Sequence, residues 1–318
     1  MKRSGALVDY ASSEDDEEQA PVVQPAAKKR KLPALASNLV VPAPVDNPAL
    51  HQGRIRSSPH VEGQFAAYVY VPVQMPRGSA LRTLLDNALR HGKEAVPILH
   101  AIGDAEQGSD ERELHVSLTR PVYLRAHQRE EFRTAVRSVS RKHTAFPASF
   151  ANFAELTNDE RTRTFLTMEV GAGHRELEAL CSALAPTLRT YRQKEFYDKP
   201  RFHASIAWAL LAQTGPAVPK SAPPPTDSDA DDHSHPPQEA PSSVANGVRQ
   251  EGSTVLLSAT PDGFPTIPCF PKDLISSLEE EFGSSLRSRH VGAFDAEYVC
   301  IKIGKDVYKF RLQSESSL

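Results

Sequence analysis

Segments in which apolar and polar residues alternate predict a series of short β-strands along this chain. Residues 65–71 are aromatic and β-branched, a composition typical of a buried strand. Residues 164–170 alternate in the same way and are closed by Gly171 and Gly173. The remaining predicted strands cover 114–118, 201–211 and the two arms of a C-terminal hairpin at 298–303 and 307–312.

Apolar residues at helical spacing separate these strands. Residues 81–89 carry them at i, i+3, i+4 and i+8, and His91-Gly92 is expected to end this helix. Further amphipathic helices are predicted over 127–141, 174–188 and 272–282. The order strand, helix, strand therefore occurs twice. This repetition indicates layered helices and strands built by duplication, in which a pseudo-two-fold axis brings equivalent strands together at a central cleft.

Two segments break this pattern. Residues 1–61 hold an acidic run at 14–18, a basic run at 28–31 and many prolines, so we predict a disordered tail. Residues 213–253 are rich in proline and aspartate and predict a disordered insertion. The ordered domain is thus expected to span 62–318 around that insertion. The basic run fits a nuclear localisation signal, although a solvated cluster of charges explains it equally well.

Composition narrows the classes of function. The chain has 318 residues, of which 39% are hydrophobic, and a net charge of −3, unlike a polycation that coats nucleic acid. An RNA substrate would therefore be recognised through a few local contacts. The three cysteines show no CxxC spacing, which argues against a disulfide framework or a zinc site. No apolar run is long enough to cross a bilayer, so we expect no membrane partner.

The candidate chemistry lies in two tripeptides, His115-Val116-Ser117 and His203-Ala204-Ser205. Both fall within predicted strands, where residues i and i+2 point to the same face. Each histidine should therefore share a face with its serine, while Val116 and Ala204 pack behind the strand. One HxS tripeptide is a weak signal, because it occurs often by chance, but two copies in matching strands are much more specific.

Two imidazoles and two hydroxyls converging on one anion can cleave a phosphodiester. A neutral histidine removes the proton from a ribose 2′-hydroxyl, and a protonated one delivers a proton to the departing 5′-oxygen. The serine hydroxyls can hold the phosphate oxygens on which charge develops. We find no carboxylate cluster spaced to bind a metal, so we predict neither a metal nor another cofactor.

These motifs resemble those of the 2H phosphoesterase superfamily, and in particular the U6 small nuclear RNA 3′-end phosphodiesterase family. The resemblance covers about 62–212 and 254–318. It rests on four segments, Leu114–Leu118, Thr162–Phe165, Phe196–Trp208 and Ile301–Gly304. It implies an α+β, two-lobed 2H phosphoesterase-like fold. It also implies a 3′–5′ exoribonuclease that trims an oligouridine tail and leaves a 2′,3′-cyclic phosphate, which some members open to a monophosphate.

The resemblance also implies residue roles. His115 would be the proton acceptor and His203 the proton donor, with Ser117 and Ser205 on the phosphate. Tyr197 matches an aromatic residue that stacks on a terminal base. The other positions that we assign to substrate binding are Val116, Lys199, Arg201 and Ala204. A solvated charge is an equally good interpretation of Lys199 and Arg201. We expect a monomer that acts on RNA in the nucleus.

Other functions stay open on the sequence. The same fold could serve as a cyclic-nucleotide or 2′–5′ phosphodiesterase. The chain could also be a non-catalytic RNA-binding scaffold, whose tail and insertion recruit partners. A serine nucleophile paired with histidine is a further possibility, but the chain has no Gly-x-Ser-x-Gly motif to support it.

Overall fold

Two strand–helix–strand units form the centre of the fold, and the last strand of each carries one of the HxS tripeptides. The structure is a computed structural model that describes residues 46–56, 58, 61–103, 112–212 and 257–314. These residues fall within one compact unit, 43–318. The first unit consists of β1 (Gln64–Met75), α1 (Ala80–Ala95) and β3 (Arg112–Ser117). The second consists of β6 (Arg163–Val170), α3 (His174–Thr190) and β7 (His203–Leu210).

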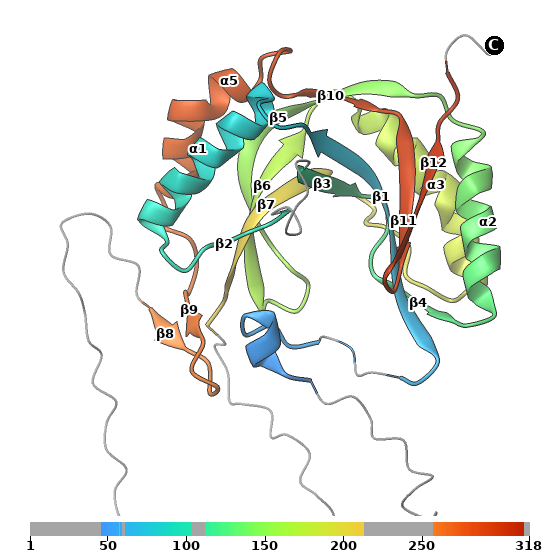
Figure 1. Cartoon of the computed structure of the whole chain (residues 1–318), viewed down its shortest axis with the longest axis horizontal. Coiled ribbons are helices and arrows are strands. Elements are labelled where there is room, and N and C mark those ends of the chain that lie inside the picture. The colour runs from blue at the N-terminus through green and yellow to red at the C-terminus, as the bar shows by residue number, and fades with distance from the viewer. Residues whose placement is uncertain (1–45, 57, 59–60, 104–111, 213–256, 315–318) are drawn as a thin grey trace, which may run out of the picture. The chain divides into compact units, whose positions relative to one another are not determined.

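A single curved sheet joins the two units (Figure 1). Its strands run in the order β10-β5-β6-β7-β3-β1-β11-β12, with every neighbouring pair antiparallel. The order is symmetric about the β7–β3 pair, which confirms the predicted duplication and the α+β class. The other strands are β2 (His100–Ala101), β4 (Val122–Arg125), β5 (Phe146–Thr157), β10 (Ala293–Ala296), β11 (Tyr298–Ile303) and β12 (Asp306–Arg311).

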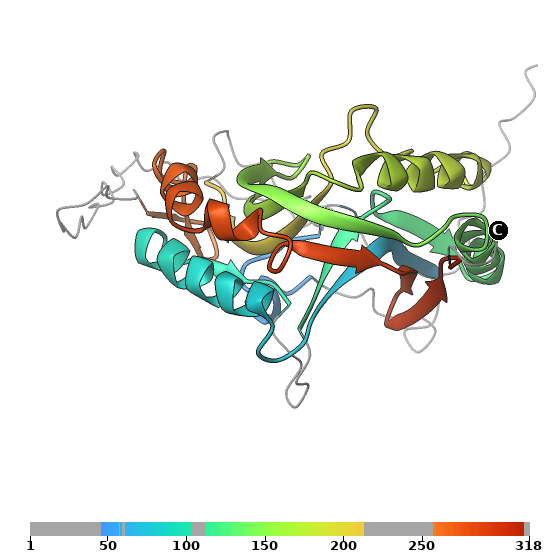
Figure 2. The ribbon, with the colours of Figure 1, turned by 90° about the horizontal axis from the view of Figure 1, so that it is seen from above.

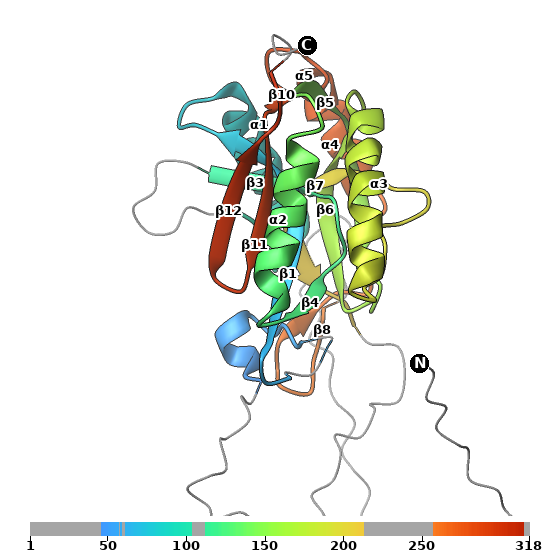
Figure 3. The same cartoon turned by 90° about the vertical axis from the view of Figure 1, so that its right-hand side faces the viewer.

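Helices cover the two ends of this sheet. The helix α2 (Gln128–Ser140) lies beside α3 and packs on β11 and β12 (Figure 3). At the other end α1 packs on α4 (Leu274–Leu278) and α5 (Ser284–Leu286), with a π-turn at Glu279–Gly283 between them (Figure 2). The helices that pack on the sheet leave the HxS side chains uncovered, because those side chains point to the other face of β3 and β7.

The predicted end of the first helix is wrong. The helix α1 runs through His91 and Gly92 to Ala95. A Cβ atom on Gly92 would lie 3.1 Å from the Leu99 side chain and 3.6 Å from that of Leu166. The glycine therefore permits close packing of the helix on the sheet and does not terminate the helix. The predicted helix 272–282 is likewise divided, because the π-turn interrupts it.

The pattern of the sequence did not predict β5, which pairs with β6 along most of its length. Pro147 and several small residues obscure its alternation, and the register shifts between Phe150 and Asn152. The strand matters for function because it completes one wall of the candidate site.

The ordered region also begins earlier than the predicted boundary at residue 62. Residues Pro48–His51 form a 3₁₀ helix, and Gly53 is buried with φ +80°. A Cβ atom on Gly53 would lie 2.6 Å from the Leu210 side chain, so only glycine lets this segment lie on the end of β7. The basic run at 28–31 and the predicted insertion 213–253 lie outside the described residues.

Candidate active site

The two HxS tripeptides meet at one residue pair. Val116 of β3 is the Cα partner of Ala204 of β7 in an antiparallel register. Antiparallel pairing then places His115 across from Ser205 and Ser117 across from His203. All four side chains lie on the face opposite Val116 and Ala204. Each histidine thus lies opposite the serine of the other motif, the arrangement needed to surround one phosphate.

Burial follows the predicted alternation along both strands. Val116 and Ala204 are 0% exposed, while the flanking histidines and serines are partly exposed. The side chains of Val116 and Ala204 therefore belong to the core. Any contact these two residues make with a substrate is restricted to their backbone atoms.

A cleft of about 420 Å³ opens over this face of the sheet. Ser117, His203 and Ser205 form its floor, and the segment before β7 brings Tyr197, Lys199 and Arg201 to its wall. Within the described residues, neither serine hydroxyl has a hydrogen-bond partner, so both are available to a ligand. His115 lies beside Ser117 on the same face of β3, next to the cleft but outside its lining.

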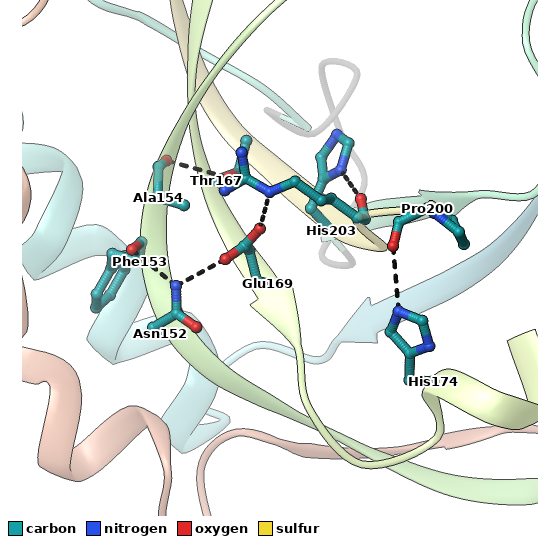
Figure 4. Close-up of polar contacts among 9 residues, drawn as sticks. Asn152, Phe153, Ala154, Thr167, Glu169, His174, Pro200 and His203 are labelled. Carbon is teal, nitrogen blue, oxygen red and sulfur yellow. Dashed lines mark hydrogen bonds and ion pairs between the residues drawn. The ribbon is translucent and has the colours of Figure 1, made fainter. Parts of the chain in front are cut away.

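The backbone fixes the tautomer of His203. Its Nδ1 lies 2.6 Å from the carbonyl oxygen of Arg201 (Figure 4). A carbonyl only accepts hydrogen bonds, so Nδ1 carries the hydrogen and donates it. Nε2 is then the nitrogen that gains or loses a proton during a reaction. His174 anchors the same segment, because its ring nitrogen donates to the carbonyl of Pro200 over 3.2 Å.

Glu169 supports His203 from the neighbouring strand. It is the cross-strand partner of His203, and its carboxylate accepts hydrogen bonds from Arg201 at 2.6 Å and from Asn152 at 2.9 Å (Figure 4). Burial acts to raise the pKa of Glu169, but these two hydrogen bonds hold it below its usual value. The carboxylate therefore stays ionised beside the imidazole.

His115 lies among aromatic rings. The ring centroids of Tyr68 and Tyr70 are each 5.6 Å from that of His115. Burial lowers the pKa of His115, and the nearby charges of His203 and Lys302 lower it further, while Glu113 opposes the shift. The strand register places His115 and His203 on the same face of neighbouring strands.

The two histidines have different neighbours. Burial lowers the pKa of His203 and the charge of Arg201 acts in the same direction, while the Arg201 carbonyl and the Glu169 carboxylate favour its protonated form. At His115 the Glu113 carboxylate opposes the lowering of the pKa by burial and by the charges of His203 and Lys302. The hydrogen bond to a backbone carbonyl is therefore the feature that distinguishes His203.

Tyr197 stands at the rim of the cleft and is 43% exposed. The guanidinium of Arg120 lies 4.0 Å from its ring centroid, and its hydroxyl donates to Asp159 over 3.0 Å. Arg120 also forms an ion pair with Asp159 at 3.4 Å. The ring is thus held rigidly at the entrance, where a flat group can stack on it.

Several of these residues were missed by the sequence prediction, notably Glu169, Arg120 and Tyr68. Glu169 gave a usable signal, since it is a carboxylate within an otherwise apolar strand. Arg120 and Tyr68 gave none, because only the fold brings Arg120 to the cleft and Tyr68 against His115. Among the described residues, no three His, Cys, Asp or Glu side chains gather as a metal site. No described helix has the length and apolar character to cross a bilayer.

Paired HxS strands at the centre of one antiparallel sheet are the arrangement that the resemblance to 2H phosphoesterases implies. The family model described as "HVSL: Uncharacterised conserved protein" matches residues 31–244, and its four letters spell residues 115–118 of this chain. The "U6 snRNA phosphodiesterase 1" of Drosophila melanogaster is 32% identical over 223 residues, covering 64% of this chain and 82% of the relative. That of Bos taurus is 31% identical over 233 residues, covering 67% and 84%.

The chain therefore belongs to the HVSL family, the family of the U6 snRNA phosphodiesterases. Among solved structures, "Kluyveromyces marxianus Usb1 with uridine monophosphate" is similar at 13% sequence identity, with a TM-score of 0.46. The similarity covers 78% of this chain and 98% of that one.

Proposed function

We propose that this protein is a 3′–5′ RNA exonuclease that trims the oligouridine end of U6 small nuclear RNA. The observation that carries the proposal is the crosswise register of the two motifs, which brings two histidines and two serines together on one face of the sheet. The substrate is inferred from the names of the two curated relatives described above, both U6 snRNA phosphodiesterase 1.

The reaction is an internal transesterification. His115 takes the proton of a ribose 2′-hydroxyl, and the oxygen attacks the adjacent phosphorus. The bond to the 5′-oxygen of the terminal nucleoside breaks, and His203 delivers a proton from Nε2 to that oxygen. Ser117 and Ser205 donate hydrogen bonds to the non-bridging oxygens as charge develops there. The shortened RNA ends in a 2′,3′-cyclic phosphate, which attack by water can open to a 3′-phosphate.

The wall of the cleft supplies substrate contacts. Tyr197 offers its ring to the terminal base, a contact worth about 1–3 kcal/mol per stacked base in other proteins. Lys199 lines the cleft without an ion pair among the described residues, so its charge is available to the RNA backbone. Arg201 combines a cleft position with its bond to Glu169, so it both contacts the substrate and supports His203.

The proposal includes a monomeric enzyme that works in the nucleus and uses no metal. Light scattering on the purified chain tests the monomer. A fluorescent fusion of residues 1–60, with and without substitution of Lys29 and Arg30, tests the location. Excess EDTA should leave the rate unchanged, and strong inhibition would reject the metal-free mechanism.

The central experiment is mass spectrometry of the RNA 3′ end after reaction with an RNA that ends in oligouridine. The wild-type chain should release uridine from the first linkage and uridine 2′,3′-cyclic phosphate or uridine 3′-phosphate from each later one, and leave a cyclic phosphate or 3′-phosphate on the RNA. His115→Ala and His203→Ala should each abolish trimming while the circular dichroism spectrum stays unchanged. Normal trimming by either variant would refute the assignment.

The same assay distinguishes the alternatives. A panel of oligouridine, 2′–5′ oligoadenylate and small cyclic phosphates identifies the preferred substrate. Tight RNA binding without turnover of any of them would favour a binding scaffold. An oligouridine with a 2′-deoxy residue at the reacting position should bind but resist cleavage, because it lacks the attacking oxygen.

A further inference from the structure

A β-bulge extends the catalytic face along β7. Leu166 pairs with Ala207 and Thr167 with Ser205, so Ile206 is an extra residue in β7. Beyond the bulge, Trp208 is the cross-strand partner of Phe165. Phe165 shares the face of Glu169 on β6, so the bulge turns Trp208 toward the face that carries His203 and Ser205.

Cationic side chains gather on this tryptophan. The guanidinium of Arg54 lies 5.3 Å from the Trp208 ring centroid, and that of Arg163 lies 5.9 Å from it. The ring of His100 stacks on Trp208 with centroids 4.4 Å apart. Trp208 itself is only 4% exposed, while Arg54 is exposed and Arg163 partly so. The buried indole thus supports two guanidinium groups that solvent can reach.

Among the described residues, no carboxylate forms an ion pair with either arginine. In the described part of the chain, neither guanidinium has an ion pair, and the only side-chain hydrogen bond is from Arg54 Nε to the carbonyl of His51 at 3.0 Å. Glu160, the nearest acidic influence on Arg163, accepts a hydrogen bond from Asn158. Burial and the charge of Arg54 lower the pKa of Arg163. An anion bound between the two groups would relieve this repulsion.

The cluster adjoins the catalytic cleft. The Arg163 guanidinium lies 5.3 Å from the ring centroid of Phe165, which lines the cleft. The backbone N–H of Arg163 donates to the side chain of Asn158, another lining residue. Because a strand rises about 3.3 Å per residue, Trp208 lies on the order of 10 Å along β7 from Ser205.

We propose that Arg54 and Arg163 form a second phosphate site, which binds the RNA backbone on the 5′ side of the cleaved linkage. The inference rests on the proposed function, since an exonuclease that cuts the last linkage leaves every other phosphate on the 5′ side. A guanidinium stacked on a ring by its face keeps its edge N–H groups free for phosphate oxygens.

Local backbone contacts hold Arg54 close to this site. Gly53 is buried against Leu210 and Phe264, and its φ of +80° favours glycine. Asp46 closes the segment by accepting the backbone N–H of Arg56 at 2.7 Å and pairing with its Nε at 3.6 Å. Arg56 therefore provides a matched control. It belongs to the same segment and carries the same charge, but it is already paired and does not contact Trp208.

The test compares Arg54→Ala with Arg56→Ala on two substrates, the dinucleotide UpU and a five-residue oligouridine. UpU contains only the cleaved phosphate. Arg54→Ala should raise the KM for the longer substrate about tenfold, leave its kcat unchanged, and leave both constants for UpU unchanged. Arg56→Ala should behave like the wild type on both substrates.

A binding measurement does not depend on catalysis. Fluorescence anisotropy with a five-residue oligouridine that carries 2′-deoxy at the reacting position gives Kd as a function of salt. Arg54→Ala should reduce the slope of log K against log salt by about 0.7, the value for one phosphate contact on a single strand. Arg163→Lys keeps the charge but loses the paired N–H donors of the guanidinium. It should therefore raise Kd at any given salt concentration and leave the slope unchanged.

Two results would overturn the second phosphate site: equal losses on UpU and the longer substrate, or equal effects of Arg54→Ala and Arg56→Ala. If the wild type cleaved no RNA, the proposed function would fail. The anisotropy arm would still decide whether the site binds a phosphate chain.

Discussion

The two HxS strands carry nearly the same tripeptide in different surroundings. His115 on β3 lies against the rings of Tyr68 and Tyr70, with Lys302 and His203 as charged neighbours. His203 on β7 donates Nδ1–H to a carbonyl and lies across from an ionised Glu169. The sheet makes the two motifs symmetric in position, while the adjoining strands make them asymmetric in charge.

This difference teaches how a duplicated fold can divide one reaction. A symmetric pair would titrate together and neither histidine would be assigned to one proton. Here a positive charge favours the neutral form of each histidine and a carboxylate opposes it, but only His203 also donates Nδ1–H to a backbone carbonyl. The predictions below test whether this asymmetry determines the roles of acid and base.

The largest effect is expected from alanine substitution of each histidine, compared between UpU and a substrate whose leaving group needs no general acid. In uridine 3′-(4-nitrophenyl phosphate) the leaving phenolate departs without protonation. His203→Ala should lose roughly 10³-fold on UpU but less than about tenfold on this ester, whereas His115→Ala should lose roughly 10³-fold on both. Release of 4-nitrophenolate, followed by its absorbance, gives the rates.

The reverse pattern, with His115→Ala rescued by the ester and His203→Ala not, would exchange the two roles. Equal losses of both variants on both substrates would mean that the asymmetry of the surroundings does not assign the protons. Both variants should keep the wild-type melting temperature within a few degrees, since both histidines are only partly buried.

The serines should give the next largest effect. Ser117 and Ser205 both line the cleft, one from each strand. Replacing either with alanine should reduce kcat about 100-fold on UpU with little change in KM, because the lost hydrogen bond strengthens as charge develops on phosphate. Exposed Ser182 of α3 serves as a control, and Ser182→Ala should match the wild type. A change confined to KM would contradict a role in the transition state.

The smallest effect should come from substitution of two glutamates by glutamine. It is also the most informative about the different surroundings of the two histidines. Glu113 raises the pKa of His115 and Glu169 raises that of His203, so a glutamine at either position lowers the pKa of its own histidine. With Glu169→Gln, His203 loses its proton at a lower pH than in the wild type. Activity should therefore begin to decline at a lower pH on the basic side of the profile. Glu113→Gln keeps the base neutral to lower pH, so activity should extend further on the acidic side.

The pH dependence of kcat/KM, measured on UpU, distinguishes these opposite shifts. Titration of the two imidazoles by NMR assigns each limb of the profile to its histidine. If both substitutions moved the same limb, or neither moved one, the electrostatic account of the two roles would be wrong.

Much of the fold could be predicted from the sequence because local spacing determines it. The period of two placed His115 with Ser117 and His203 with Ser205, and burial on β3 and β7 confirms that alternation. The amphipathic spacing also located α1, α2 and α3. The prediction that Gly92 ends the helix failed, because this glycine is required by close packing against Leu99, which lies outside the helix.

The sequence by itself determined most of the central strands and helices and the pairing of each histidine with its serine on one strand face, because these depend on neighbours a few residues apart. Only the tertiary structure decided that Val116 lies opposite Ala204, that Glu169 lies across from His203, and that the bulge at Ile206 brings Trp208 under Arg54. Strand register and bulges are determined by packing between segments distant in the sequence, and no local spacing encodes them.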